Sequence, residues 1–182
     1  MTLVVEDGSC VASANAFVSR DALITFAADY YPSNIPAYDE TTDGAILRAS
    51  SWLSTYPDWD GTMACGRGLQ GLAWPRSGVV DCNGDTIPDN EVPVEVQQAT
   101  FLAALAEIAS PGVLTPTVTP GKQVKRIKVD VIEQEFMTPV DQGDGGVDPT
   151  KMLRPVLTAI QDLLKCLAAL PDGANTPWPW VA

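Results

Sequence analysis

Apolar residues recur at helical spacing in four stretches of the chain, which predicts a mainly helical fold. Ser19 is placed to cap a first helix that ends before Pro32, and Thr42 is the expected cap of a second helix that ends before Pro57. The positions expected to be buried are Leu23, Phe26, Ala27 and Tyr30 in the first helix, and Ile46, Ala49, Leu53 and Tyr56 in the second.

The third predicted helix, about 93–109, is the longest uninterrupted helical pattern, with Pro93 suited to its first position. Alanines interrupt its apolar face and allow close approach of a neighbouring helix, either within the fold or from another copy. That apolar face comprises Val94, Phe101, Leu102, Leu105 and Ile108. The last helix lies within 148–170, with its main part from Pro155 and a stripe made of Val156, Leu157, Ile160, Leu163, Leu164 and Leu167.

Between the second and third helices, glycines predict an irregular loop at 58–71. An apolar knot follows, in which Trp74 is expected to plug the helix pair and Arg76 to bond carbonyls of the loop. The Asn83-Gly84 pair then predicts a β-hairpin at 78–88. The residues of this structural core motif are Leu72, Trp74, Pro75 and Arg76.

Residues 122–136 alternate between apolar and charged side chains, which predicts one long strand or a hairpin that bends near Asp130. This arm is either a solvated strand face or a patch for a phosphate backbone or an acidic partner. It holds four of the chain's 11 positive charges, namely Lys122, Lys125, Arg126 and Lys128.

The C-terminal tail carries Trp178, Trp180 and Val181 on a proline-stiffened stretch that cannot be helical. Large side chains with few rotatable bonds suit interface contacts, either with the chain's own body or with a partner. The expected organisation is one structural domain of the mainly α class, with a short β-hairpin and an extended β arm as a minor α+β part. Its parts are a helical core at 1–111, a linker and β arm at 112–147, a C-terminal helix at 148–170 and an extended tail at 171–182.

The net charge of −12 and pI near 4.1 oppose nonspecific binding of nucleic acid or anionic membrane by the body as a whole. Such a charge suits solubility, or a surface past which DNA slides. The sequence contains no apolar stretch of about 18 residues, so we expect no membrane span.

The chain has no histidine, and its four cysteines are far apart, so neither a zinc site nor any other metal or cofactor is expected. Free thiols in a reducing cytosol are the expectation, with a Cys65–Cys82 disulfide as the alternative. No nucleophile and base occur in a catalytic pattern, so we expect no catalytic residues and no enzyme. Asp81, Asn83, Asp85 and Asp89 are spaced like the start of a calcium loop, but Gly84 is misplaced for one, and a turn with solvated carboxylates is favoured.

One motif is fairly specific: Gln70 followed by Leu72-Ala73-Trp74-Pro75-Arg76-Ser77-Gly78-Val79. Supporting motifs are Val5-Glu6-Asp7-Gly8, residues 14–19, Leu47-Arg48-Ala49 with Trp52-Leu53 and Tyr56, Trp59 with Gly61, and Ile87-Pro88. Over about residues 3–136, the chain resembles tailed-bacteriophage head–tail connector (adaptor) proteins, of the family labelled putative DnaT-like ssDNA-binding protein. It departs from the family pattern in the loop 62–69 and after residue 156.

The resemblance implies two alternative functions. As an adaptor, the protein would form a ring of copies, expected to be dodecameric, in the virion at the head–tail interface, after synthesis in the host bacterial cytoplasm. Its partners would be the portal protein and a tail-side stopper, terminator or tail-tube protein, and genomic double-stranded DNA would pass through the lumen without specific binding. The alternative is a single-stranded-DNA-binding protein that uses residues 122–128. The sequence favours the adaptor, because single-strand binders need exposed aromatics within a cationic groove, and none precedes Phe136 in the basic arm.

Overall fold

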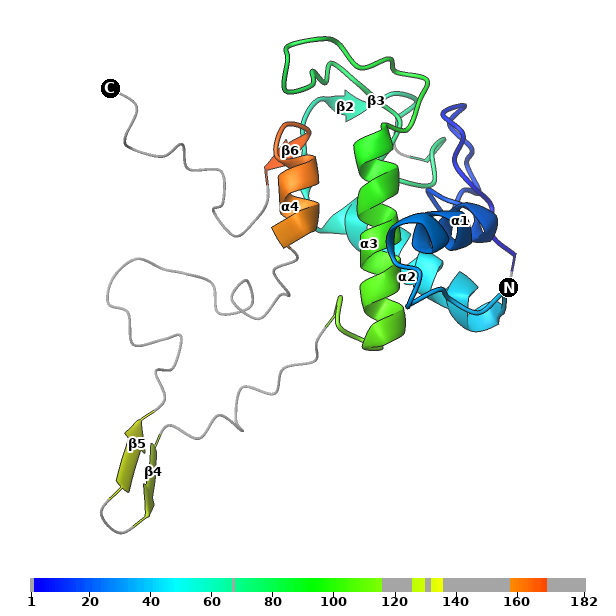
Figure 1. Ribbon diagram of the computed structural model, residues 1–182. Coiled ribbons are helices and arrows are strands. Elements are labelled where there is room, and N and C mark those ends of the chain that lie inside the picture. The colour runs from blue at the N-terminus through cyan, green and yellow to red at the C-terminus, as the bar shows by residue number, and fades with distance from the viewer. Residues whose placement is uncertain (1, 67, 116–125, 130–131, 136–157, 170–182) are drawn as a thin grey trace, which may run out of the picture.

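Figure 1 shows the computed structural model of the chain, in which residues 2–66, 68–115 and 158–169 and the backbone of two strands at 126–129 and 132–135 are described. Within these ranges the helices are α1 (Arg20–Tyr30), α2 (Glu40–Thr55), α3 (Val94–Ala109) and α4 (Thr158–Leu164). The strands form antiparallel pairs: β1 (Asp58–Trp59) with β6 (Ala168–Ala169), β2 (Thr62–Met63) with β3 (Arg76–Ser77), and β4 (Arg126–Val129) with β5 (Ile132–Glu135). The fold is mainly helical with a small β content, in agreement with the predicted class.

Side-chain caps fix the starts of α1 and α2. The Ser19 hydroxyl accepts a hydrogen bond from the Ala22 amide at 3.1 Å, as predicted. The predicted cap of α2 is wrong, because Asp39 takes that position and accepts from the amides of Thr41 and Thr42 at 3.0 and 3.1 Å. One carboxylate thereby satisfies two free amides and starts α2 earlier than predicted.

Helix α3 packs on α2 through a face of small side chains. Ala99, Ala103 and Ala104 of α3 are completely buried, as are Ala45 and Ala49 of α2. Small side chains at a helix contact allow the two backbones to approach closely. Of the two predicted neighbours of the alanine-rich helix, the one observed is a helix of the same chain, α2.

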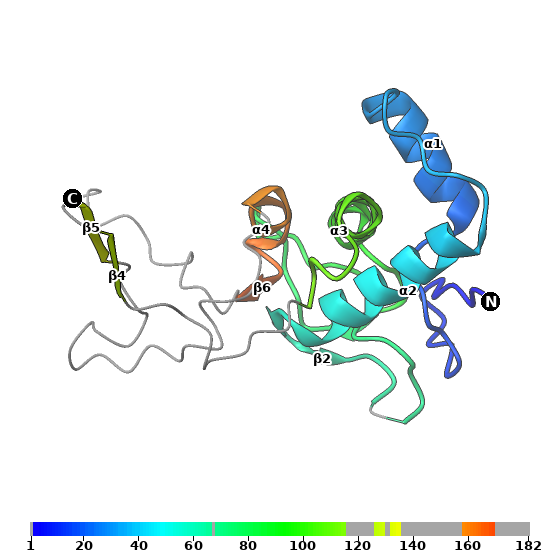
Figure 2. The ribbon, with the colours of Figure 1, turned by 90° about the horizontal axis from the view of Figure 1, so that it is seen from below.

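The larger apolar side chains of α3 lie away from its closest contact with α2. Leu102 and Leu105 are half-buried, and α3 lies between α4 and the pair of α1 and α2 (Figure 2). Phe101 stacks on Phe26 of α1 with ring centroids 4.7 Å apart. Val94, which the pattern predicts to be buried, is instead 58% exposed at the start of the helix.

The burial of Trp74 and the bonds of Arg76 to loop carbonyls are observed. Trp74 is completely buried and meets the ring of Trp59 edge-on at 5.6 Å. The Arg76 guanidinium donates to the carbonyls of Asp60 and Gly61 at 2.7 and 2.8 Å and to that of Ala73 at 3.2 Å. These bonds join the loop at 58–61 to the knot. They also give hydrogen-bond donors to carbonyls that lie outside the helices.

The loops contain more β structure at 58–71, and less at 78–88, than the sequence predicts. Strands β1 and β2 lie in the supposedly irregular loop, and β1 pairs with β6. The hairpin at 78–88 is reduced to one antiparallel bridge between Val80 and Thr86. Asp81 organises the turn, since its Oδ1 accepts from the amides of Asn83 and Asp85 at 2.8 and 2.9 Å.

The C-terminal helix is shorter than predicted. Helix α4 ends at Leu164, and the chain turns into β6 rather than continuing to residue 170. Of the two predicted forms of the β arm, the hairpin is the one observed, because β4 and β5 pair antiparallel. Residues 116–125, 136–157 and the tail 170–182 lie outside the described residues.

All four cysteines form disulfides, Cys10 with Cys65 and Cys82 with Cys166. The expectation of free thiols is therefore wrong, and so is the alternative Cys65–Cys82 bond. The partners are 55 and 84 residues apart in sequence, so only the folded chain brings them together. Cys82–Cys166 fastens the turn between α4 and β6 to the loop at 78–88.

A buried carboxylate closes the end of α3. Glu107 is 2% exposed and accepts from Arg48 Nε at 2.7 Å and from the amides of Gly112 and Leu114 at 2.8 and 3.4 Å. Burial raises the pKa of Glu107, but these hydrogen bonds outweigh it, so the net pKa lies below the ordinary value of 4.5. Glu107 thus holds α2 and the turn after α3 in place.

We expect Glu107→Gln to lower the free energy of unfolding by about 1–3 kcal/mol, because the amide cannot satisfy Arg48 and both main-chain donors as a carboxylate does. Urea unfolding measures this loss. Arg48→Met is the matched control and should cost less than about 1 kcal/mol, since the Arg48 side chain is 52% exposed.

Wild type and Glu107→Gln also test whether Glu107 is ionised in the folded protein. A lowered folded-state pKa stabilises the fold above the unfolded-state value, and the effect is lost as pH falls through the folded-state pKa. The stability difference between wild type and Glu107→Gln should therefore shrink as the pH falls below 4.5. A constant difference between pH 7 and pH 3 would contradict an ionised Glu107.

Removal of the Cys82–Cys166 disulfide should destabilise the fold strongly. For a closed loop of this length the chain-entropy relation gives about 4–5 kcal/mol. The measurement is urea unfolding of Cys82→Ser/Cys166→Ser in buffer without reductant, with a thiol assay to show that Cys10 and Cys65 stay oxidised. An unchanged unfolding midpoint would be inconsistent with this bond as a constraint on the unfolded chain.

Candidate nucleic-acid interface

Three arginines of the helical core, Arg20, Arg48 and Arg76, are engaged within the fold, and Arg67 lies outside the described residues. Arg20 Nε donates to Asp43 at 2.7 Å, and a second guanidinium nitrogen contacts the other carboxylate oxygen. This hydrogen bond from Arg20 holds the pKa of Asp43 below its ordinary value of 3.8. Arg48 is bound to Glu107 and Arg76 to main-chain carbonyls. Each of these three guanidinium groups therefore already has a partner within the fold.

Positive charge is concentrated in the connection between α3 and α4. Residues 122–128, the basic segment, hold four of the chain's 11 Lys and Arg residues and no Asp or Glu. The remaining positive residues of this connection are Lys151 and Arg154. Most of the chain's 23 acidic residues lie instead in the helical body. The net charge of the chain therefore describes the body rather than the arm.

Strand β4 contains the second half of the basic segment, and its backbone register pairs positive with negative positions. Arg126 lies opposite Glu135, and Lys128 lies opposite Glu133. Opposite charges at directly paired positions of antiparallel strands attract each other. The register thus places two acidic positions of β5 directly opposite two positive positions of β4.

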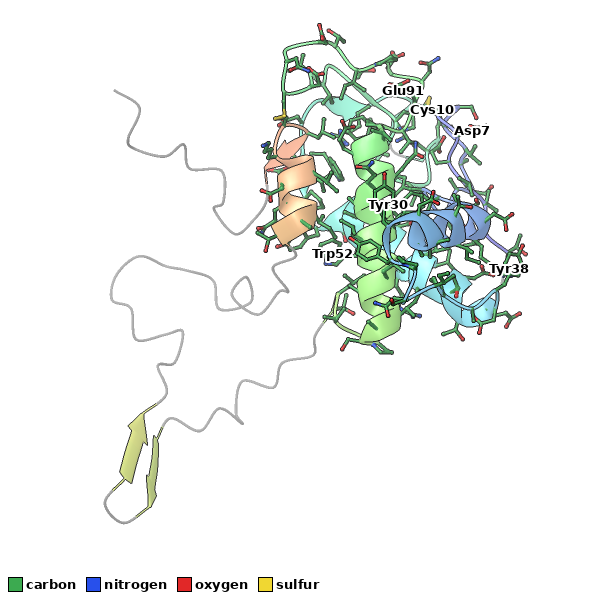
Figure 3. All side chains as sticks on the ribbon, in the orientation of Figure 1. Asp7, Cys10, Tyr30, Tyr38, Trp52 and Glu91 are labelled. Carbon is green, nitrogen blue, oxygen red and sulfur yellow. A yellow bond between two sulfur atoms is a disulfide. The ribbon has the colours of Figure 1, made fainter. Side chains whose placement is uncertain are left out.

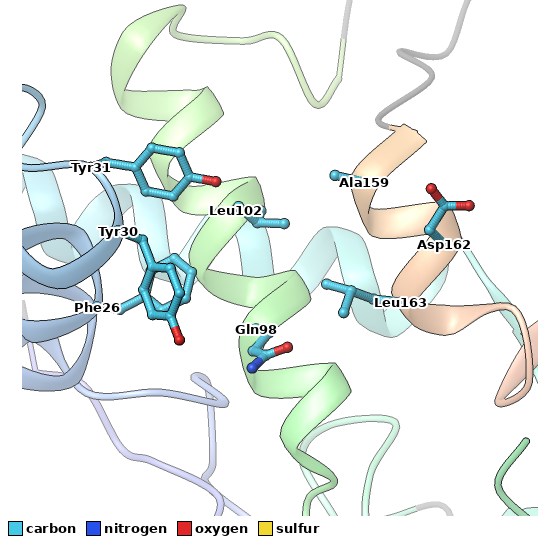
Figure 4. A pocket seen from close by; sticks show the side chains of 8 residues that line it. All are labelled: Phe26, Tyr30, Tyr31, Gln98, Leu102, Ala159, Asp162 and Leu163. Atoms are coloured by element: carbon cyan, nitrogen blue, oxygen red, sulfur yellow. The ribbon is translucent and has the colours of Figure 1, made fainter. Parts of the chain in front are cut away.

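A groove of about 410 Å³ lies between α1, α3 and α4 (Figure 4). We call it the aromatic groove, because one wall consists of rings from the end of α1. The other walls are apolar side chains of α3 and α4, with one amide and one carboxylate. Its lining residues are Phe26, Tyr30, Tyr31, Gln98, Leu102, Ala159, Asp162 and Leu163.

The aromatic wall is a continuous stack that runs from the core to the surface. Phe101 is buried, and its ring centroid lies 4.7 Å from that of Phe26. Phe26 in turn stacks on Tyr30 at 4.8 Å, with 30° between the ring planes. Tyr30, which is seen in Figure 3, is 67% exposed, and Tyr31 is 42% exposed. The outermost ring of the stack is thus held by two rings behind it and remains open to solvent.

Two acidic side chains outside the groove, Glu6 and Asp81, accept hydrogen bonds from main-chain amides and so stabilise local turns. Glu6 is buried and accepts from the amides of Gly8, Cys10 and Val11 at 2.9–3.0 Å. Asp81, the first residue of the calcium-like spacing, accepts from main-chain amides of its own turn, which lowers its pKa. Among the described residues, no three His, Cys, Asp or Glu side chains are grouped to hold a metal ion. No helix in the described ranges has the length and apolar character to span a membrane.

The predicted site residues fall into three groups. Leu72, Trp74, Pro75 and Arg76 lie together in the core and at its edge. Arg126 and Lys128 are placed by the backbone of β4, and Lys122, Lys125, Trp178, Trp180 and Val181 lie outside the described residues.

The aromatic groove was not predicted. The helical pattern places Tyr30 on the buried face, but that turn of α1 extends beyond the body that would cover it (Figure 2). Two neighbouring tyrosines before Pro32 were the available signal, since adjacent positions of a helix cannot both face the core.

Comparison with known proteins gives one family. A family model described as "Putative DnaT-like ssDNA binding protein" matches residues 1–177. No curated protein and no solved structure matches the chain.

The family match corrects the interpretation favoured by the sequence. Its description names single-stranded DNA and nothing of a phage connector, so the recognition of a virion head–tail adaptor is wrong. The expected ring, the portal and tail partners and the virion location depended on that interpretation, and no comparison tests them. The match spans nearly the whole chain, including the part after residue 156 where the motifs depart from the pattern. The chain belongs to the family that this model describes.

Proposed function

We propose that this protein binds single-stranded DNA, with the basic segment 122–128 on the phosphate backbone, and that it carries out no covalent chemistry. The observation that carries the proposal is the family match over residues 1–177. The charge distribution supports the basic segment as the phosphate site, since it combines four positive residues with no acidic one.

The fold supports the same choice by elimination. Of the core arginines that the structure describes, Arg20 and Arg48 are held by carboxylates and Arg76 by carbonyls, and the acidic body repels a polyanion. Phosphate neutralisation releases counterions, so each contact adds about −0.7 to the slope of log K against log salt for a single strand. Four contacts give a slope of about −3.

Replacement of the four basic residues by glutamine (Lys122, Lys125, Arg126 and Lys128) should abolish most binding of a labelled single-stranded oligonucleotide and flatten this slope. Fluorescence anisotropy over a series of salt concentrations measures both quantities. The control is Lys151→Gln/Arg154→Gln/Lys165→Gln, which removes three positive charges elsewhere and should keep most of the slope. Losses in proportion to the number of charges removed would show that net charge, rather than the basic segment, governs binding.

The register of the β4–β5 hairpin predicts a pair of substitutions that should strengthen, rather than weaken, the binding of single-stranded DNA. Glu133→Gln/Glu135→Gln removes the negative charges from the positions paired with Arg126 and Lys128, so single-strand affinity should rise several-fold at low salt. The control is Asp141→Asn/Asp144→Asn, which makes the same change of charge farther along the chain. A gain of the same size in the control would argue against local competition within the hairpin.

A further inference from the structure

We propose that the aromatic groove is a base-stacking site for the same single strand, with Tyr30 as the ring on which a base stacks. This inference rests on the proposed function and adds to it the place that holds the bases. The basic segment supplies charge but no aromatic side chain, whereas sequence-independent single-strand binding normally combines the two.

The stack of rings gives Tyr30 the properties of a binding platform. Its inner neighbours, Phe26 and Phe101, are half-buried and buried, and each pair of rings stacks at less than 5 Å. Because the inner rings already restrict Tyr30, a base that adds to the stack has little side-chain entropy to remove. Tyr30 is exposed and lines the groove, so a base continues a series of rings that begins in the core.

The remaining walls suit an uncharged base better than a phosphate. Leu102 and Leu163 provide apolar contacts across from the rings, and the Gln98 amide offers both a donor and an acceptor to a base edge (Figure 4). Asp162 is the one carboxylate among the lining residues, and it repels phosphate. Bases should therefore enter the groove while the sugar–phosphate backbone stays outside.

The chain connects the basic segment directly to two walls of the groove. Residues 116–157 join α3 to α4, and these two helices form walls of the groove. Ala159, the second residue of α4, is itself a lining residue, so the connection that carries the basic segment returns to the fold at the groove. The segment is tethered at both ends to the element pair that would hold the bases.

The test compares Tyr30→Ala with Tyr30→Phe, which keeps the ring. Loss of one stacked base should weaken binding of a single-stranded oligonucleotide about 5- to 150-fold in Tyr30→Ala, while Tyr30→Phe stays near wild type. The control is Tyr38→Ala, because Tyr38 is 66% exposed but lies against Arg20 rather than in the groove. The slope of log K against log salt should be the same in all four proteins, since stacking neutralises no phosphate.

An abasic oligonucleotide of the same length separates stacking from charge. Wild type and Tyr30→Ala should bind it equally, because it offers phosphates but no base. Equal affinity of these two proteins for the normal oligonucleotide would overturn the stacking site and leave the basic segment untouched. So would a loss in Tyr30→Ala that is as large on the abasic strand as on the normal one. Failure of wild type to bind any single strand would instead refute the proposed function itself.

Discussion

The close contact between α2 and α3 determines where the other elements can lie. Alanines on both helices occupy this contact, so the larger side chains of α3 point toward α1 and α4. Phe101 then stacks on Phe26, and Leu102 becomes part of a groove rather than of the central core. Glu107 fixes the same pair of helices from one end, through Arg48 and the turn after α3. The aromatic groove is thus a consequence of small residues at the centre of the fold.

The parts of the fold that follow from local chemistry could be predicted from the sequence. The Ser19 cap, the buried face of α2 and the bonds of Arg76 to loop carbonyls all depend on neighbouring residues. The disulfides could not be predicted, because partners such as Cys82 and Cys166 are 84 residues apart and local patterns do not show which distant segments pack together. Tyr30 was assigned to the wrong environment, since periodicity shows which face of a helix is apolar but not how far the body extends to cover it.

The overall charge of the chain was a poor guide to its function because the charges are segregated. A net charge of −12 argues against nucleic-acid binding only if positive residues are spread evenly. Here Arg20, Arg48 and Arg76 of the core have partners within the fold, while the basic segment itself contains none of the acidic residues. The sequence already contained this distribution, but the engagement of Arg20 and Arg48 became visible only in the fold. An acidic body also restricts a polyanion to the one region where its charge is matched.

The wall of the groove that α4 provides depends on interactions outside that helix. Seven residues are too few for a stable isolated helix, so α4 owes its position to tertiary contacts. Ile160 and Leu164 are buried against the body, β6 pairs with β1 directly after the turn, and Cys166 is bonded to Cys82 within that turn. Leu163 and Asp162 are therefore held opposite the aromatic wall by a strand pair and a disulfide as well as by packing. A groove built in this way keeps its width without a long helix, and the chain can leave α3 and return at α4 with a large insertion between them.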